Sequence, residues 1–484
     1  MARYIPDGSC QTLFVDGSLE SLLPSTSVAR SIRHGLWELD FSRFDSVYHN
    51  DDEGRPAIDP RRLSGLWILA LLRGVTSSVD VARLCQTDIE FRWLSGDAHV
   101  QKSTLSAFRS SNQDALGELS TQLLAALARS DMLPGKELAI DGTVIRAASS
   151  CGSSHTRKQL RRRTARLKHI ISEKYTESDL LDDAGERLVK KHQRFERALQ
   201  EMSKLGLEGD DDRLTITEPD VSVKRLKNGS FGPAHNVQVV TDLDSGAIIT
   251  TEVIDQKNDG GQLLPQVRQA QQELDRVGEY LEKCVESDRS VKAVVADSAY
   301  HDTRQLVTLE KERVKMYVPD DRTRNRRPLG VSEQFGRDKF VYDTATDRMQ
   351  CPSGEWLQRR KSNKDSTVIT YQAAASVCHA CRHKRECSPH ARSGRSVNRP
   401  VNADVMKVIA DRVASVRGKQ YRQARGVVVE GSIGRLIERL NWRRCRIWGN
   451  AGAWAETLWR QITHNLLLLI GHWKPLVPKK APAG

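Results

Sequence analysis

Two kinds of apolar spacing divide this chain into a helical first part and a mixed later part. Over about the first 135 residues, apolar side chains recur every three or four positions, as in Leu63, Leu66 and Leu69, which is the spacing of an amphipathic helix. Acidic, proline and hydroxyl residues precede several of these runs, where they favour a helix start. The predicted helices begin after Asp59-Pro60, after Ser77-Ser78 and at a Ser103-Thr104 cap, and a longer one runs from Leu116 to Leu127.

Further along the chain, short apolar runs typical of strands alternate with helical segments. Three strands, a helix, a strand, a helix and a strand follow one another, which is the order of a ribonuclease H-like fold. We therefore expect an α/β fold class with a ribonuclease H-like catalytic core, in which the first and fourth strands are neighbours. The predicted elements are a strand over 138–147, a hairpin of 235–242 and 247–254 joined at Asp244-Ser-Gly, a helix over 262–282, a strand ending at Asp297, a helix from Asp302 and a strand over 314–318.

Two insertions interrupt the predicted core. Residues 155–212 are charged and have helical apolar spacing, which predicts an exposed helical hairpin. Its basic first half, including Arg161-Arg-Arg and Lys168, is either a phosphate contact or an ordinary solvated face, and the residues leave both open. The expected parts are a helical N-terminal domain (1–135), a catalytic core (136–320 with 400–475), the helical hairpin (155–212), a cysteine-rich insertion (321–399) and a tail (476–484).

The second insertion contains four cysteines, Cys351, Cys378, Cys381 and Cys387. Four thiolates satisfy tetrahedral zinc, and the Cys351-Pro-Ser-Gly turn and the Cys378-His-Ala-Cys381 pair are typical of its ligands, although the third interval is irregular. The alternative is four reduced cysteines without a metal. A closed thiolate site has no open position, so such a zinc would be structural rather than catalytic. The histidines that could replace one ligand are His379, His383 and His390.

Composition favours a soluble protein that binds a polyanion. The 484 residues include 75 Lys+Arg against 62 Asp+Glu, which gives a net charge of +13 and a pI near 9.3. Nucleic acid is the leading candidate partner. Nine cysteines are odd in number and four of them cluster, which favours a reducing compartment over a disulfide scaffold. With no signal-like N-terminal stretch and no apolar run long enough for a bilayer, we expect a cytoplasmic location, associated with the nucleoid in a bacterium.

Three carboxylates occupy distinct settings that suggest one metal site acting on DNA. Asp141 and Asp297 each end a strand-like apolar run and precede a small residue, so each should emerge where a buried strand reaches a sheet edge. Glu430 follows Val427-Val-Val and precedes Gly431, at the entrance to a segment with helical apolar spacing. Two strands and a helix would then converge on one point.

Together these features resemble the DDE-type insertion-sequence transposases, specifically the branch named for insertion sequence 1182. The similarity extends from about Asp59 to Leu469, and its parts are jointly specific because all occur in family order. The matching segments are Asp59-Pro-Arg-Arg-Leu through Phe91-Arg-Trp-Leu-Ser-Gly, Ser103-Thr-Leu-Ser-Ala-Phe-Arg, Asp141-Gly-Thr-Val-Ile-Arg-Ala-Ala-Ser, His235-Asn-Val-Gln-Val-Val-Thr-Asp, Ala296-Asp-Ser-Ala-Tyr-His, the cysteine set preceded by Lys339-Phe-Val-Tyr-Asp, and Val429-Glu-Gly-Ser-Ile-Gly with His464-Asn-Leu.

The resemblance implies that Asp141, Asp297 and Glu430 are a catalytic triad holding two Mg²⁺ (or Mn²⁺) ions ~3.5 to 4 Å apart. It further implies end cleavage and strand transfer on double-stranded DNA by a homodimer. Hard divalent cations prefer carboxylate oxygens, in agreement with the residue types. The chain departs from the family pattern at Ile437, where related proteins often have a lysine, and Arg435 would supply the missing cation. Glu438 is the rival of Glu430.

The basic residues around Glu430 are predicted to bind the phosphates at the cleavage site. The alternative is an ordinary solvated basic helix. Arginines and a lysine of the N-terminal helices likewise predict a DNA-binding unit, or else a helical packing or dimerisation domain. Two other functions stay open: a nuclease of the same fold that does not join strands, and a domesticated or decayed DNA-binding protein. The expected DNA-binding residues near Glu430 are Arg417, Lys419, Arg422, Arg425, Arg435, Arg439, Arg443 and Arg444.

Some conspicuous polar residues have simpler interpretations. Asp242 lies in Thr-Asp-Leu-Asp-Ser-Gly, where it is expected to shape a hairpin turn. His464 and Asn465 lie on an apolar terminal helix and are expected to be satisfied core residues.

Overall fold

The computed structural model divides the chain into two compact units, which are described separately. Unit 1 comprises residues 1–258, 269–290 and 426–484, and unit 2 comprises 259–268 and 291–425. Two long helices, α11 (Leu263–Leu281) and α17 (Val416–Gly434), contain residues of both units. The residues that the structure describes are 5–8, 11, 17–45, 56–175, 182–226, 228–256, 258–281, 290–320, 330–360, 368–389 and 392–475.

The first part of unit 1 is helical, as the apolar spacing predicts. Asp59 and Ser77 cap the helices that follow them, because their side chains accept hydrogen bonds from backbone N–H groups of the first turn. The cap predicted at Ser103-Thr104 is wrong, since that helix begins at Lys102 after Gln101, whose side chain makes no cap hydrogen bond. The helices are α1 (Leu19–Leu22), α2 (Val28–Trp37), α3 (Ser42–Asp45), α4 (Pro60–Leu72), α5 (Ser78–Thr87), α6 (Ile89–Ser95), α7 (Lys102–Ser111) and α8 (Gln113–Arg129).

Strand β5 is the centre of the sheet in unit 1. It pairs antiparallel with three other strands, and its register with β1 places Asp141 opposite Val239. Eleven of its twelve residues are buried, since the strand is covered on both faces and both edges. The strands are β1 (Glu137–Arg146), β4 (Val223–Arg225), β5 (Phe231–Asp242) and β6 (Ile248–Ile254).

Helix α18 (Gly449–Leu469) packs against β6 and the N-terminal helices, and most of its residues are buried. Its buried side-chain amides form hydrogen bonds with the backbone of β6. Asn465 accepts a hydrogen bond from Ile248 N (3.0 Å) and donates one to Ile248 O (2.8 Å), while Gln461 donates to Ile249 O (3.0 Å). These side chains pair with backbone groups of a strand that would otherwise be left unsatisfied in the core, so polar residues on an apolar helix are stabilising here.

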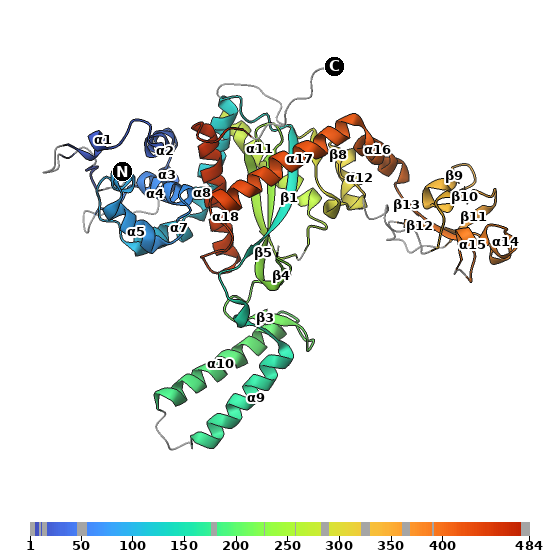
Figure 1. Cartoon of the computed structure of the whole chain (residues 1–484), viewed down its shortest axis with the longest axis horizontal. Helices are drawn as coiled ribbons and strands as arrows, with labels where there is room; N and C mark the ends of the chain where they lie inside the picture. The colour runs from blue at the N-terminus through green and yellow to red at the C-terminus, as the bar shows by residue number, and fades with distance from the viewer. Residues whose placement is uncertain are drawn as a thin grey trace. The chain divides into compact units, whose positions relative to one another are not determined.

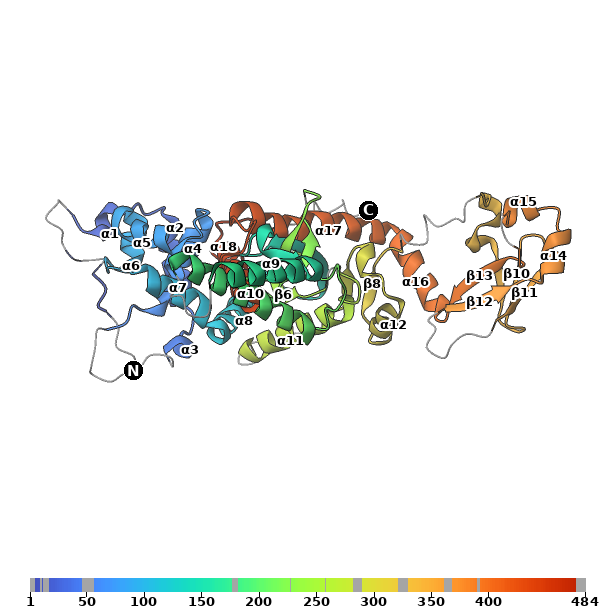
Figure 2. The same cartoon turned by 90° about the horizontal axis from the view of Figure 1, so that it is seen from below.

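The predicted helical hairpin is present in unit 1. Helices α9 (Arg157–Lys174) and α10 (Asp183–Lys204) lie side by side (Figure 1, Figure 2), and the short strands β2 (Ser154–Thr156) and β3 (Arg213–Thr215) pair at its base. Thr156 and Gln159 form a reciprocal capping box at the start of α9. The hairpin has a hydrophobic cluster of its own, formed by Leu160, Leu167, Phe195, Ala198, Met202 and Leu214.

Unit 2 contains a short parallel strand pair and a separate antiparallel sheet. Strand β7 follows α11 and pairs in parallel with β8. The chain order β1, β5, β6, α11, β7, α12, β8 matches the predicted order of the core elements. The antiparallel sheet has the order β13-β12-β11-β10-β9. The elements of this unit are β7 (Ala293–Val295), α12 (Thr303–Lys311), β8 (Lys315–Tyr317), β9 (Val341–Asp343), β10 (Arg348–Gln350), β11 (Trp356–Arg359), β12 (Val368–Gln372), α14 (Ala375–Ala380), α15 (Lys384–Cys387), β13 (Ser396–Pro400) and α16 (Ala403–Ala414).

Candidate active site

Asp141 lies in the middle of β1 rather than at its end. The strand continues to Arg146, in agreement with the strand predicted over 138–147, and it is the buried apolar run that ends at the aspartate. The residues before it, from Leu138 to Ile140, are buried, whereas Asp141 and Gly142 are partly exposed. One carboxylate oxygen, Oδ1, accepts a hydrogen bond from Gly142 N (2.9 Å). A carboxylate at the point where a buried strand becomes accessible is well placed to bind a cation.

Asp297 occupies the turn that follows β7. As predicted, a short buried strand precedes it, and it is itself partly exposed. It caps the 3₁₀ turn Ser298–Tyr300, because its Oδ1 accepts a hydrogen bond from Ala299 N (2.8 Å). That bond fixes one oxygen and orients the carboxylate.

Glu430 lies well inside helix α17, which begins at Val416, rather than at the entrance to the helical segment as predicted. Val428 and Val429 are buried while Glu430 is exposed, which is the burial pattern of one helical turn. The helix penalty of a β-branched residue is below about 1 kcal/mol, whereas burying a valine contributes about 1.5 kcal/mol or more. Burial therefore decides the conformation of this segment.

The turn between β5 and β6 anchors both acids of unit 1. Asp242 ends β5 opposite Leu138, three residues from Asp141 along β1. On the other side of the turn, Gly246 O accepts a hydrogen bond from Ser432 Oγ (2.9 Å), two residues after Glu430. Strand β1 and the end of α17 are thus tied to the same hairpin.

Asp242 shapes this turn in the way predicted from its motif. Its Oδ1 accepts hydrogen bonds from Ser245 N (2.9 Å) and Asp244 N (3.1 Å), and its Oδ2 accepts one from Gly135 N (3.0 Å). Burial raises the pKa of Asp242 to about 6, although the hydrogen bonds from Ser245 and Gly135 oppose that shift. The residue is buried and saturated with hydrogen bonds, so it serves the turn rather than a ligand.

The donor set suits a hard divalent cation, since all three candidate acids offer carboxylate oxygens. Asp141 and Glu430 belong to unit 1 and Asp297 to unit 2. Among the described residues, no group of three His, Cys, Asp or Glu side chains is arranged to hold a metal ion. The structure therefore gives the local setting of each acid and leaves their grouping as a prediction.

Several predicted DNA-binding residues make internal contacts. Arg444 donates to the carbonyls of Ala147 (3.0 Å) and Ser149 (3.1 Å). Arg435 donates to Lys474 O (2.7 Å), and burial lowers its pKa. These two guanidinium groups join backbone segments, so we expect their main effect on stability. Two further residues have side-chain partners, Arg443 in an ion pair with Glu438 and Arg417 in a hydrogen bond to Tyr421.

Other members of the predicted set are available to a ligand. Lys419, Arg422 and Arg439 are exposed, and in the described parts of the chain their side chains have no hydrogen bond or ion pair. Arg425 is half-buried on α17. Exposed cations without internal partners can bind phosphates without first breaking a contact, so Lys419, Arg422 and Arg439 are the stronger candidates.

The cations of the N-terminal helices are mostly engaged within that domain. Arg73 pairs with both Asp88 and Glu90, while Arg109 is buried and donates to Thr76 O (2.8 Å). Arg92 and Arg83 form ion pairs with Asp97 and Asp80. A count of basic residues in the sequence thus overstates the positive surface of these helices.

The four clustered cysteines line one small cavity in unit 2, and all four are free thiols. They do not form a metal-holding group among the described residues, so the prediction of structural zinc at Cys351, Cys378, Cys381 and Cys387 is not supported. The cavity is mostly apolar: the side chains of Phe335, Leu357 and Ala373 also line it. Of the alternative ligands, His379 contacts Arg392 O (3.2 Å), His383 packs against Phe335, and His390 lies outside the described residues.

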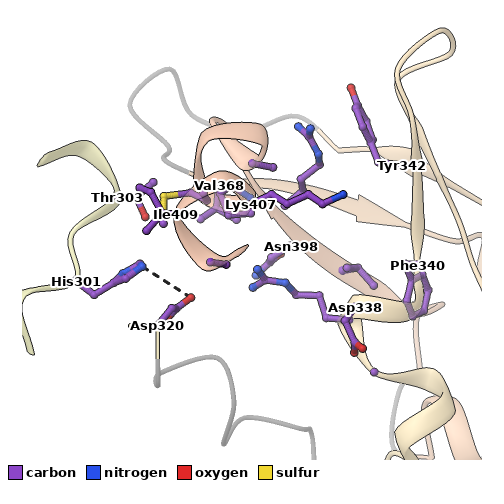
Figure 3. Close-up of a pocket in the computed structure, with 18 of the residues that line it drawn as sticks. His301, Thr303, Asp320, Asp338, Phe340, Tyr342, Val368, Asn398, Lys407 and Ile409 are labelled. Carbon is purple, nitrogen blue, oxygen red and sulfur yellow. Dashed lines mark ion pairs between the residues drawn. The ribbon is translucent and has the colours of Figure 1, made fainter. Parts of the chain in front are cut away.

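A large cavity of about 1310 Å³ in unit 2 adds candidates that the sequence did not single out. His301, four residues after Asp297, lines it and points toward Asp320 (Figure 3), with 4.0 Å between Nε2 and Oδ2. Lys407 and the predicted residue Arg422 also line it. The position of His301 just after Asp297 was the available signal for it. This combination of cations and a partly buried imidazole can accept an anionic group.

Two segments of the chain match family models of transposases. Residues 18–111, which include α1 to α7, match a model described as a transposase domain (DUF772), and residues 350–470 match one described as a transposase DDE domain. Together they make up less than half of the chain, and they support a DDE transposase with a ribonuclease H-like core in a mixed α/β structure. The DDE match contains Glu430 and all four clustered cysteines, and it implies use of a divalent metal. Neither match includes Asp141 or Asp297.

No curated protein and no solved structure matches the chain. Within the described ranges, none of the helices is long and apolar enough to cross a membrane.

Proposed function

We propose that this chain is a DNA transposase, of the branch named for insertion sequence 1182, that binds transposon ends, cleaves them and joins their 3′ ends to target DNA. The observation that carries the proposal is the presence of two transposase-type segments in one chain, residues 18–111 and 350–470. A net charge of +13 agrees with a polyanionic substrate. Two DNA ends must be held together for joining, so the proposed active form is a homodimer on DNA.

In this proposal Asp141, Asp297 and Glu430 would hold two Mg²⁺ (or Mn²⁺) ions. When bound, such ions activate the attacking oxygen and stabilise the leaving oxygen of an in-line displacement at phosphorus. The chain's own contribution begins with orientation: Asp141 and Asp297 each have one oxygen fixed by a neighbouring backbone N–H. The exposed side chains of Lys419, Arg422 and Arg439 would hold the phosphates on either side of the scissile bond.

The test is Mg²⁺-dependent cleavage of duplex DNA taken from the flanks of the gene, with the full chain as enzyme. We expect Asp141→Asn, Asp297→Asn and Glu430→Gln each to reduce cleavage by more than about 100-fold, because each removes a charged metal ligand. DNA binding by the same variants should be retained, since none of the three side chains is a cation.

Glu438→Gln is the matched control for the glutamate. Glu438 lies in the π-helical turn Arg435–Arg439, is exposed, and forms an ion pair with Arg443. We expect cleavage by this variant to stay within a few-fold of the unaltered chain. Intact Mg²⁺-dependent cleavage by Asp141→Asn would refute the site assignment, and cleavage without any joining would favour a nuclease of the same fold.

A further inference from the structure

Helix α9 is much more basic than the helix it packs against. Its 18 residues contain eight Lys or Arg and one acid, Glu173, whereas the 22 residues of α10 contain six Lys or Arg and four acids. The excess of seven positive charges on α9 is more than half of the net charge of +13 of the whole chain. This helix is therefore a distinct basic element.

Two of its cations are neutralised at the base of the hairpin. Arg157 pairs with Glu208 (2.8 Å) and Arg161 with Asp210 (3.4 Å), both from the segment that leads out of α10. A third, Arg163, contacts the ring of His155 (3.1 Å). These contacts hold the base of the hairpin together and explain part of the charge.

Three other cations form a stripe along the outer face of α9. Lys158, Arg162 and Arg166 follow one another at four-residue intervals, so they lie in one row. The row is opposite Leu160 and Leu167, which pack into the core of the hairpin. All three are exposed, and within the described residues their side chains have no hydrogen bond or ion pair. We call these three residues the α9 stripe.

The stripe is unfavourable for the helix itself. Like charges four residues apart destabilise a helix by about 0.2 to 0.5 kcal/mol for each pair, and Lys158 also opposes the helix dipole in the first turn. Helix α10 differs, since its Lys190 pairs with Glu186 and its Lys204 with Glu201. The charge pattern of α9 thus indicates an external anion rather than internal stabilisation.

We propose that the α9 stripe is a contact surface for the phosphate backbone of double-stranded DNA, separate from the DDE acids. The identity of the polyanion rests on the proposed function. The stripe spans about 12 Å of helix axis, over which B-DNA presents several phosphates, because duplex DNA carries one charge per ~1.7 Å. Phosphate contacts contain no sequence information, so the hairpin would hold DNA without reading it.

The proposal is tested by binding of the full chain to duplex DNA at several salt concentrations, followed by fluorescence anisotropy. The triple variant Lys158→Gln, Arg162→Gln and Arg166→Gln removes the stripe and keeps good helix formers. Each lost phosphate contact lowers the slope of log K against log salt by ~0.9, so we expect the slope to fall by roughly 2 to 3 and affinity at low salt by at least about 10-fold. Thermal stability should be unchanged or slightly raised, because like-charge repulsion is relieved.

A matched control removes the same charge from the other helix. Lys190→Gln, Arg197→Gln and Lys204→Gln alter exposed cations of α10, and the slope should change by less than about 1. Equal slopes for the stripe variant and the unaltered chain would overturn the proposal, as would equal losses in the two triple variants. If the unaltered chain fails to bind duplex DNA at all, the proposed function itself fails; if only the stripe has no effect, the proposed function stands.

Discussion

Replacement of Glu218 by glutamine should loosen the contact between the sheet and helix α18. The carboxylate is buried, with 1% of its side chain exposed. Its Oε2 accepts a hydrogen bond from Ser149 N (2.8 Å), and its Oε1 accepts one from Gly449 N (2.7 Å) and lies 3.7 Å from His235 Nε2. Glu218 thus links the segment after β1, strand β5 and the positive end of the α18 dipole. A glutamine would turn an amide N–H₂ toward one of these donors.

The magnitude follows from the pKa of Glu218. Burial opposes its ionisation, but interactions with His235, Ser149 and Gly449 outweigh burial and lower the pKa from 4.5 to about 2. Because the folded pKa lies below the unfolded one, the ionised group stabilises the fold above about pH 4.5, and this stabilisation is lost as the pH falls toward 2. A difference of about 2.5 units corresponds to about 3 kcal/mol at pH 7, of which about 1 kcal/mol remains at pH 3.

Hydrogen exchange of peptides from β5 and the first turn of α18 measures this directly. We expect Glu218→Gln to raise exchange on the order of 100-fold at pH 7 and much less at pH 3, with variant and unaltered chain compared at the same pH. Glu279→Gln is the control, because Glu279 is exposed on α11 and without a partner among the described residues. An exchange ratio near 1 at pH 7, or one that does not shrink at pH 3, would show that the carboxylate does not hold these elements together.

Two further predictions concern single side chains. Arg444→Gln should lower the free energy of unfolding by about 1 to 3 kcal/mol with little effect on the salt dependence of DNA binding, because Arg444 donates hydrogen bonds to the backbone carbonyls of Ala147 and Ser149. Arg439→Gln should instead lower the slope of log K against log salt by ~0.9 at unchanged stability, because Arg439 is exposed. The opposite pattern would contradict the division of these cations into stabilising and DNA-binding residues. Burial lowers the pKa of His464 to about 3, so its contribution to stability is full above about pH 6.5 and is lost as the pH falls. About 2 kcal/mol should disappear between pH 7 and 5 in thermal unfolding. The variant His464→Gln, whose amide nitrogen takes the place of Nε2 as a donor to Gly246 O, should lack that loss.

The order of elements could be predicted from the sequence because long periodic segments and hairpin signals are local. Asp59 and Ser77 mark helix starts by their own side chains, and Asp244-Ser-Gly marks the turn between β5 and β6. Boundaries were harder where packing overrides propensity. Val427-Val-Val has a strand-like composition, yet its burial on one side of α17 makes it helical. Gln101 precedes α7 without capping it, and no local signal marks that position.

The candidate site was predictable only as far as residue type and local context allow. Asp297 lies after a buried strand as expected, but the partners of the cations depend on residues far away in the sequence. Arg444 meets carbonyls almost 300 positions earlier, and Arg73 meets two acids of the next helices. A run of arginines in a sequence does not show which of them are already used. The structure shows which cations have internal contacts, and it leaves Lys419, Arg422, Arg439 and the α9 stripe as the preferred candidates for the proposed DNA contact.

The β5–β6 turn shows how buried polar residues outside the candidate triad can position it. Gly246 O accepts a hydrogen bond from Ser432 Oγ (2.9 Å) and lies 3.0 Å from His464 Nε2, so the end of α17 and helix α18 both contact one carbonyl. Asp242 accepts a hydrogen bond from Ser245 N in the same turn, and it pairs with Leu138 of β1. We expect loss of these contacts to alter the position of Glu430 relative to Asp141, although none of them involves either acid. Residues that are conventional core groups by burial are therefore positioning residues in the proposed site.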